Sequence, residues 1–140
     1  MKTATQARDN EFIAICKEII SQNIASGRRT SLVLVIDEAI HRRPRCHYVS
    51  YERASRILHY IDACGSTAIR SRLATLKWLE LYNQVKETMN GPRGLPFDKA
   101  LSFVLSFKRP SRFYITHARA LRLLRPHITT TISYQAHSND

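Results

Sequence analysis

Two pairs of arginines are the residues in this chain best suited to bind an anion. Arg53 with Arg56, and Arg119 with Arg122, lie on segments whose sequences predict helices. On a helix, a spacing of three places both guanidinium groups on one side. Guanidinium groups form paired hydrogen bonds with phosphates, so each pair suits neighbouring phosphates of a polyanion.

A hydroxyl residue that can cap a helix precedes each arginine pair. Ser50 lies three residues before Arg53, and Thr116 lies three residues before Arg119. The N–H groups at the start of a helix carry partial positive charge and attract anions. We therefore expect an anion to bind where each short basic helix begins.

The two basic segments repeat one pattern. Residues 43–58 and 109–124, which are 66 positions apart, are identical at seven of sixteen pairs. Each copy holds an arginine before a proline, a tyrosine, a capping hydroxyl and an arginine pair. The pattern predicts a tandem duplication that presents the same surface twice.

The composition is strongly basic, with 22 Lys and Arg against 11 Asp and Glu and a formal net charge of +11. No Asp or Glu lies between Lys99 and Ser138, where seven Lys and Arg residues occur. A field of this sign attracts phosphates and speeds encounter with nucleic acid, mostly without sequence preference. The alternative is a generally basic surface that keeps the protein in solution.

Arginines on the links before the short helices add to the candidate site. Tyr48 and Tyr114 on the same links are candidates for stacking on bases, and packing beneath the short helices is an equal alternative for both. The candidate nucleic-acid-binding arginines are Arg43, Arg45, Arg53, Arg56, Arg109, Arg112, Arg119 and Arg122.

No spacing in the chain indicates a catalytic or metal centre. Asp37 and Glu38 are the one adjacent pair of carboxylates, and no glycine-rich phosphate loop is present. One group of potential metal ligands matches no zinc pattern; it consists of His41, Cys46, His47, His59 and Cys64. We predict no metal, no cofactor and no enzymatic activity.

The three cysteines show no C-x-x-C spacing, and the N-terminal residues lack the apolar run of a signal peptide. A reducing, cytoplasmic location is therefore expected. No stretch approaches the roughly 18 apolar residues of a membrane-spanning helix, so we expect no membrane insertion.

Apolar periodicity and capping signals predict a mostly α fold. Pro44 and Pro110 introduce extended links, and Pro126 is predicted to end the last helix. The tail that follows has β propensity, and its last six residues are expected to be frayed. The predicted helices span about 6–26, 31–40, 50–64, 69–89, 96–105 and 116–125.

The chain thus reads as two pseudo-repeats of one plan: long helix, helix, extended link and short basic helix. We expect the repeats, about 1–65 and 66–126, to form a single helical domain, followed by a partly disordered C-terminal tail at 127–140. Neither repeat would bury much apolar surface alone, so we expect both to pack around one shared core. The offset of 66 pairs Phe12 with Trp78 and Ile19 with Val85 in that core.

These features together predict a non-enzymatic protein that binds nucleic acid through two quasi-equivalent basic helices. Duplex DNA is favoured over RNA, because a pseudo-two-fold protein suits a two-fold duplex and the glycine-aromatic signatures of common RNA modules are missing. The predicted link of about eight residues is longer than the turn of a helix-turn-helix. The alternative is an interaction or assembly module that docks its basic face on an acidic protein.

Overall fold

The computed structural model describes residues 3–138 and contains six α-helices with no strand in that range. The mostly α prediction is confirmed. Of the six residues expected to be frayed, 139 and 140 lie outside the described part. The helices are α1 (Ala4–Ala25), α2 (Leu32–Ile40), α3 (Tyr51–Cys64), α4 (Arg72–Met89), α5 (Phe97–Phe107) and α6 (His117–Ser138).

The predicted short basic helices are α3 and the first turns of α6, and both helices begin where their capping residues predict. The hydroxyl of Ser50 accepts a hydrogen bond from the backbone N–H of Arg53 at 3.2 Å. The hydroxyl of Thr116 accepts the matching bond from Arg119, also at 3.2 Å. Gly65 then ends α3 with φ of 75°, in the left-handed region that favours glycine. Local sequence therefore sets where each arginine pair starts.

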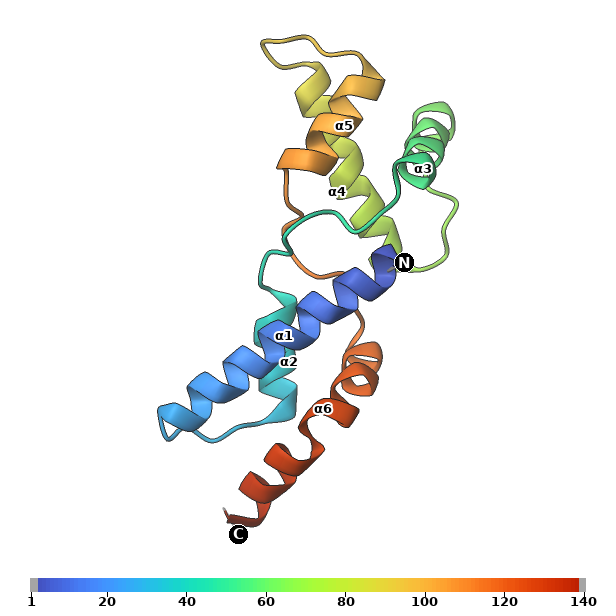
Figure 1. The fold of residues 1–140 in the computed structure, drawn as a ribbon. Helices are drawn as coiled ribbons and strands as arrows, with labels where there is room; N and C mark the ends of the chain where they lie inside the picture. The colour runs from blue at the N-terminus through green and yellow to red at the C-terminus, as the bar shows by residue number, and fades with distance from the viewer. Residues whose placement is uncertain (1–2, 139–140) are drawn as a thin grey trace.

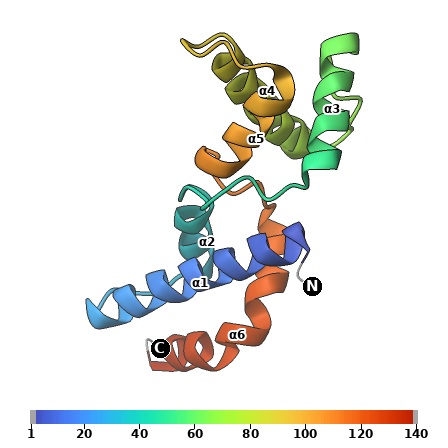
Figure 2. The same cartoon turned by 45° about the horizontal axis from the view of Figure 1, so that its top comes forward.

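The apolar residues form two separate cores (Figures 1 and 2). The first core is built by α1 and α2 together with the start of α6, and the second by α4 and α5 together with α3. The first contains Phe12, Cys16, Ile19, Ile20, Val35, Ile36, Ala39, Ile40, Phe113, Ile115, Ala120 and Leu124. The second contains Ala54, Leu58, Ile61, Trp78, Leu81, Val85, Ala100, Leu101 and Val104.

The predicted single shared core is therefore wrong. Phe12 and Ile19 lie in the first core, whereas Trp78 and Val85 lie in the second. The extended links explain the difference, because about eight extended residues reach about 26 Å. Each link is long enough to carry its short helix past its own helix pair and onto the other pair.

The two links, 41–50 and 108–116, cross between the cores (Figure 1). At the crossing, the Arg43 side chain donates hydrogen bonds to the backbone carbonyls of Arg109 at 2.9 Å and Pro110 at 3.2 Å. In return, the Arg109 side chain donates to the carbonyls of Arg43 and Pro44, both at 2.8 Å. Each arginine thus satisfies backbone carbonyls of the opposite link.

The last helix continues through Pro126, so the predicted end of that helix at the proline is wrong. Proline lacks an N–H and its ring crowds the carbonyl four residues earlier, which bends a helix when it does not end it. The ribbon of α6 changes direction along its length (Figure 2). The backbone of residues 127–138 is helical, and the β propensity of this segment is overridden.

Candidate functional site

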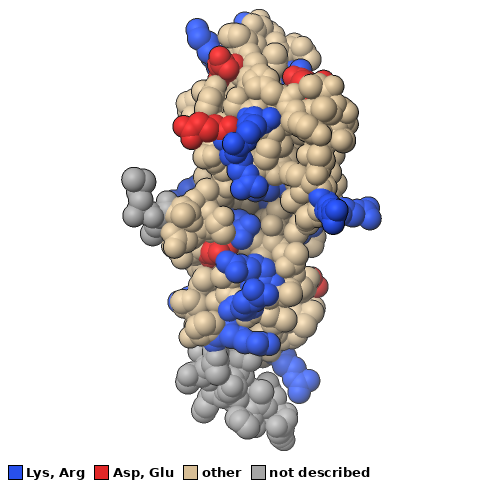
Figure 3. Space-filling model, turned by 90° about the vertical axis from the view of Figure 1, so that its right-hand side faces the viewer, with Lys and Arg blue, Asp and Glu red and all other residues tan. Residues whose placement is uncertain are grey.

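Basic side chains from four helices form a continuous group that we call the basic band. Its ends are the arginine pairs of α3 and α6, and its middle comes from α1 and α4. In Figure 3, which faces the side of the molecule where α3 and α6 lie, Lys and Arg side chains run down the middle of the surface. The basic band consists of Arg8, Arg53, Arg56, Lys77 and Arg119, together with Arg122, which follows Arg119 by three residues on α6 and so lies on the same side of that helix.

Lys77 is the residue that joins the two ends of the band. Its ammonium group lies 4.7 Å from the centre of the Trp78 ring, and the guanidinium of Arg53 lies 5.8 Å from the same ring. Burial, with the positive charges of Arg8 and Arg53, lowers the pKa of Lys77 from 10.5 to about 8. Two cations, Lys77 and Arg53, therefore lie against one aromatic ring, and the charge of Arg8 is close enough to lower the pKa of Lys77 further.

Asp9 is the carboxylate that contacts the band. Its two oxygens accept from Arg8 at 2.8 Å and from Arg119 at 3.1 Å, and its side chain is only 10 % exposed. The other four members form no ion pair with a carboxylate of the described residues; they are Arg53, Arg56, Lys77 and Arg122. Most of the positive charge in the band is thus available to an external anion.

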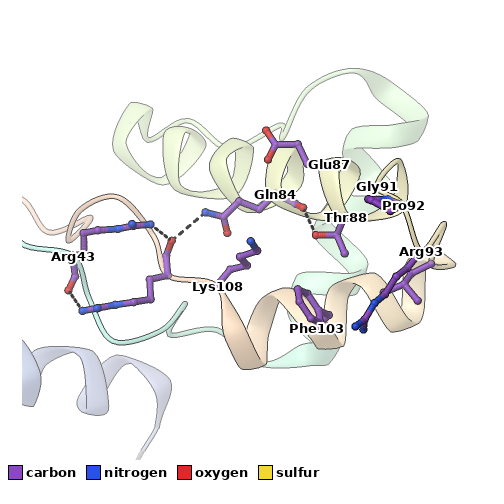
Figure 4. A pocket seen from close by; sticks show the side chains of 11 residues that line it. Arg43, Gln84, Glu87, Thr88, Gly91, Pro92, Arg93, Phe103 and Lys108 are labelled. Atoms are coloured by element: carbon purple, nitrogen blue, oxygen red, sulfur yellow. Dashed lines mark hydrogen bonds between the residues drawn. The ribbon is translucent and has the colours of Figure 1, made fainter.

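Arg43 and Arg109, two of the predicted phosphate ligands, hold the crossing of the links together. They line a groove of about 490 Å³ with Lys108 and Arg93, and Figure 4 shows Arg43 and Arg93 at opposite ends of it. Gln84, in the same view, donates to the carbonyl of Arg109 at 3.1 Å. The structure thus gives these two arginines partners on the backbone of the opposite link.

The remaining predicted residues lie on the links. The side chain of Arg45 is exposed, and that of Arg112 stacks over the ring of Tyr114 at 5.4 Å. Tyr48 donates its hydroxyl hydrogen to Glu11 at 2.7 Å, and the hydroxyl of Tyr114 donates to a second glutamate, Glu80, at 3.0 Å. Both tyrosines are half-buried, and each anchors its link to a long helix, Tyr48 to α1 and Tyr114 to α4.

Arg8 and Lys77, at the centre of the band, were not among the sequence candidates. The sequence does relate these two residues to each other, but the number of positions between them differs from the 66 positions between the two arginine pairs. Glu11 and Glu80 receive matching bonds from the two links and are 69 positions apart, as are Arg8 and Lys77. This offset exceeds by three the 66 positions between segments 43–58 and 109–124, so a comparison made at an offset of 66 does not reveal the correspondence.

The thiols and histidines considered for chemistry have ordinary structural surroundings. Burial raises the pKa of the Cys16 thiol to about 12, and burial with the nearby charge of Glu11 raises that of Cys46. His47 is buried, which lowers its pKa, and its ring lies 2.6 Å from the amide oxygen of Gln84. Between residues 3 and 138, no three His, Cys, Asp or Glu side chains are grouped to hold a metal ion.

Over the described range, no helix is both long enough and apolar enough to cross a membrane. Comparisons with protein-family models, curated proteins and solved structures found no significant match to this chain.

Proposed function

We propose that this protein binds the phosphate backbone of nucleic acid, with duplex DNA as the preferred ligand, and has no enzymatic activity. The basic band carries the proposal, because it joins both predicted arginine pairs into one surface. Two arginine pairs on separate faces would each offer a weak, local charge. A continuous band offers several phosphate contacts along one ligand, and the affinity grows with their number.

The chemistry of the band favours phosphates over other anions. Five of its six members are arginines, whose planar guanidinium groups match phosphate oxygens in paired hydrogen bonds. The aromatic partner in the band, Trp78, is only 1 % exposed, so it is not available for stacking on bases. We therefore expect backbone contacts to dominate and sequence preference to be modest.

We also propose that the chain is a tandem repeat whose third helices have exchanged places. Three matched sets of contacts support it: the reciprocal bonds of Arg43 and Arg109, the two tyrosine–glutamate bonds, and the two hydroxyl caps. An exchange of this kind gives the protein a pseudo-two-fold relation between α3 and α6. That relation suits the two-fold symmetry of duplex DNA.

The test is a binding series with a short DNA duplex, single-stranded DNA and RNA at several salt concentrations. We expect the duplex to bind most tightly, with an affinity that falls steeply as salt rises. Arg53→Ala and Arg122→Ala, at opposite ends of the band, should each weaken duplex binding about tenfold, as expected for a lost charge-assisted contact of about 1.5 kcal/mol. Lys17→Ala is the control, because Lys17 is exposed and outside the band.

Binding that hardly changes with salt, or that is untouched by both arginine substitutions, contradicts the proposal. A protein that binds none of the three nucleic acids but is captured by a purified polyglutamate through the same arginines would instead support docking on an acidic protein.

A further inference from the structure

We propose that the hollow between the starts of α1, α4 and α6 holds one phosphate group of the bound polyanion. This inference rests on the proposed function and assigns it a central contact. The hollow has a volume of about 270 Å³ and is lined by three cations of the basic band, Arg8, Lys77 and Arg119. No Asp or Glu is among the described residues that line it.

The cations of the hollow come from three different helices, so their proximity is a product of the fold. Lys77 lies close enough to Arg8 and Arg53 for their charges to disfavour its protonated form. Like charges held together raise the free energy of the empty site, and an anion placed among them relieves that repulsion. The fold thus holds like charges close together at the place where we propose that the phosphate binds.

Hydroxyl groups complete the donors around the hollow. Thr5, Ser71 and Thr116 line it, and the last two are the capping residues of α4 and α6. Phosphate oxygens also accept hydrogen bonds from hydroxyl groups. The ends of these helices add partial positive charge that supports the cations without being needed to explain the site.

Asp9 limits the charge of the hollow from one side. Asp9 pairs with Arg8 and Arg119, whereas Lys77 lies beside the ring of Trp78 and not beside Asp9. Two arginines, one lysine and one carboxylate leave a surplus of positive charge, and a single phosphodiester neutralises part of it. Lys77 is therefore the cation whose charge the phosphate would compensate most directly.

The experiment measures duplex affinity against salt for the wild type, Lys77→Gln, Lys77→Arg and Lys17→Gln. Lys17 is a suitable control because it lies on the opposite side of α1 from Arg8: it is nine positions further along the helix, and each residue adds 100°. We expect K77Q to bind about tenfold more weakly, with the slope of log affinity against log salt reduced by about 0.9. K77R and K17Q should keep the wild-type slope.

The pH dependence gives a second readout that a purely structural role for Lys77 would not move. Wild-type affinity should fall between pH 7 and 9 as Lys77 loses its proton, whereas K77R should hold its affinity because arginine stays charged. A wild-type slope and affinity for K77Q, alongside weakened binding for R53A, overturns the hollow as a phosphate site and leaves the proposed function standing.

Two further arms identify the source of the phosphate. Equal effects of K77Q on duplexes with and without 5′-phosphates indicate a backbone phosphate, whereas an effect confined to the phosphorylated duplex indicates a terminal one. If the wild type binds no duplex at all, the proposed function fails, and inorganic phosphate becomes the probe. The melting temperature of the protein would then be compared in phosphate and in chloride at equal ionic strength. A higher melting temperature in phosphate that is lost in K77Q would still support the hollow as a phosphate site. No increase in the wild type would overturn it.

Discussion

Replacing Lys77 by methionine should stabilise the ligand-free protein at neutral pH. Burial and the neighbouring charges of Arg8 and Arg53 lower the pKa of Lys77 from 10.5 to about 8. The folded protein therefore disfavours a charge that the unfolded chain carries without cost. Methionine keeps an unbranched, apolar side chain in place of the lysine stem and removes the charge.

The size of the effect follows from three contributions. A lowering from 10.5 to about 8 corresponds to at most about 3.5 kcal/mol, because one pKa unit equals about 1.4 kcal/mol. Lys77 is only partly buried, so solvent screening reduces this ceiling to about 1.5–2 kcal/mol. The variant also loses the ammonium over the Trp78 ring at 4.7 Å, a contact of about 0.5–1 kcal/mol. We expect a net gain of about 1 kcal/mol.

The stability gained by Lys77→Met should decrease as the pH rises. Because the pKa of Lys77 is lower in the folded state, the unfolded chain binds more protons between pH of about 8 and 10.5. Wild-type stability therefore rises with pH across this window, relative to the variant. The advantage of Lys77→Met is complete below a pH of about 8 and is lost as the pH approaches 10.5.

Urea unfolding followed by far-ultraviolet circular dichroism measures this difference. Fluorescence of Trp78 is unsuitable, since the substitution alters the surroundings of that ring. Lys17→Met, at an exposed position of α1, should change the free energy of unfolding by less than about 0.5 kcal/mol at any pH. A Lys77→Met protein less stable than the wild type at neutral pH, or a difference that does not shrink at alkaline pH, refutes the reasoning.

Three further substitutions test the cores, the crossing and the band. Phe113→Ala should lower the free energy of unfolding by about 3–4 kcal/mol in urea titrations, because Phe113 is fully buried and packs edge-on against Phe12 with ring centroids 5.4 Å apart. Arg109→Lys should cost about 1–2 kcal/mol in the same assay, since an ammonium group cannot bond both carbonyls of the opposite link, whereas Arg45→Lys should cost almost nothing. Asp9→Asn should bind duplex DNA roughly three times more tightly in salt titrations, because it frees Arg8 and Arg119. Unchanged stability in the first two, or weaker binding in the third, would count against these roles.

The sequence predicts much of the local structure of this protein, because nearby residues decide several helix starts and stops. Ser50 and Thr116 cap their helices through hydrogen bonds to the backbone three residues ahead. Gly65 ends α3 in the left-handed conformation that its position suggests. The exception is Pro126, where the sequence rule allows two outcomes, an end or a bend, and the helix continues.

The packing of the helices is not decided locally, and here the sequence prediction fails. Apolar periodicity shows which face of α1 or α4 is buried, but not which helix covers it. The extended links around Pro44 and Pro110 allow each short helix to reach either helix pair. The choice depends on long-range contacts such as the backbone bond from Phe113 to the carbonyl of Ile40 at 2.9 Å, which has no signature in a repeat comparison.

The packing of α6 on α1 and of α3 on α4 explains why a comparison of the two similar segments selects the arginine pairs and not Arg8 or Lys77. Arg8 lies on α1 and Lys77 on α4, two helices that belong to different cores, and both line one hollow together with Arg119. The observed partners are Arg119 with Asp9 and Arg53 with Trp78.

The arginines at the two ends of the band have different neighbours, an acid for Arg119 and an aromatic ring for Arg53. This difference should affect how strongly each end holds an anion. Asp9 and Trp78 are 69 positions apart and receive corresponding cations, so the charge is offset at the α6 end and not at the α3 end. A polyanion lying along the band should therefore be held more strongly by Arg53 and Lys77 than by Arg119. Arg53→Ala should accordingly weaken duplex binding more than Arg119→Ala does, and equal losses would show that Asp9 has no influence on the bound ligand.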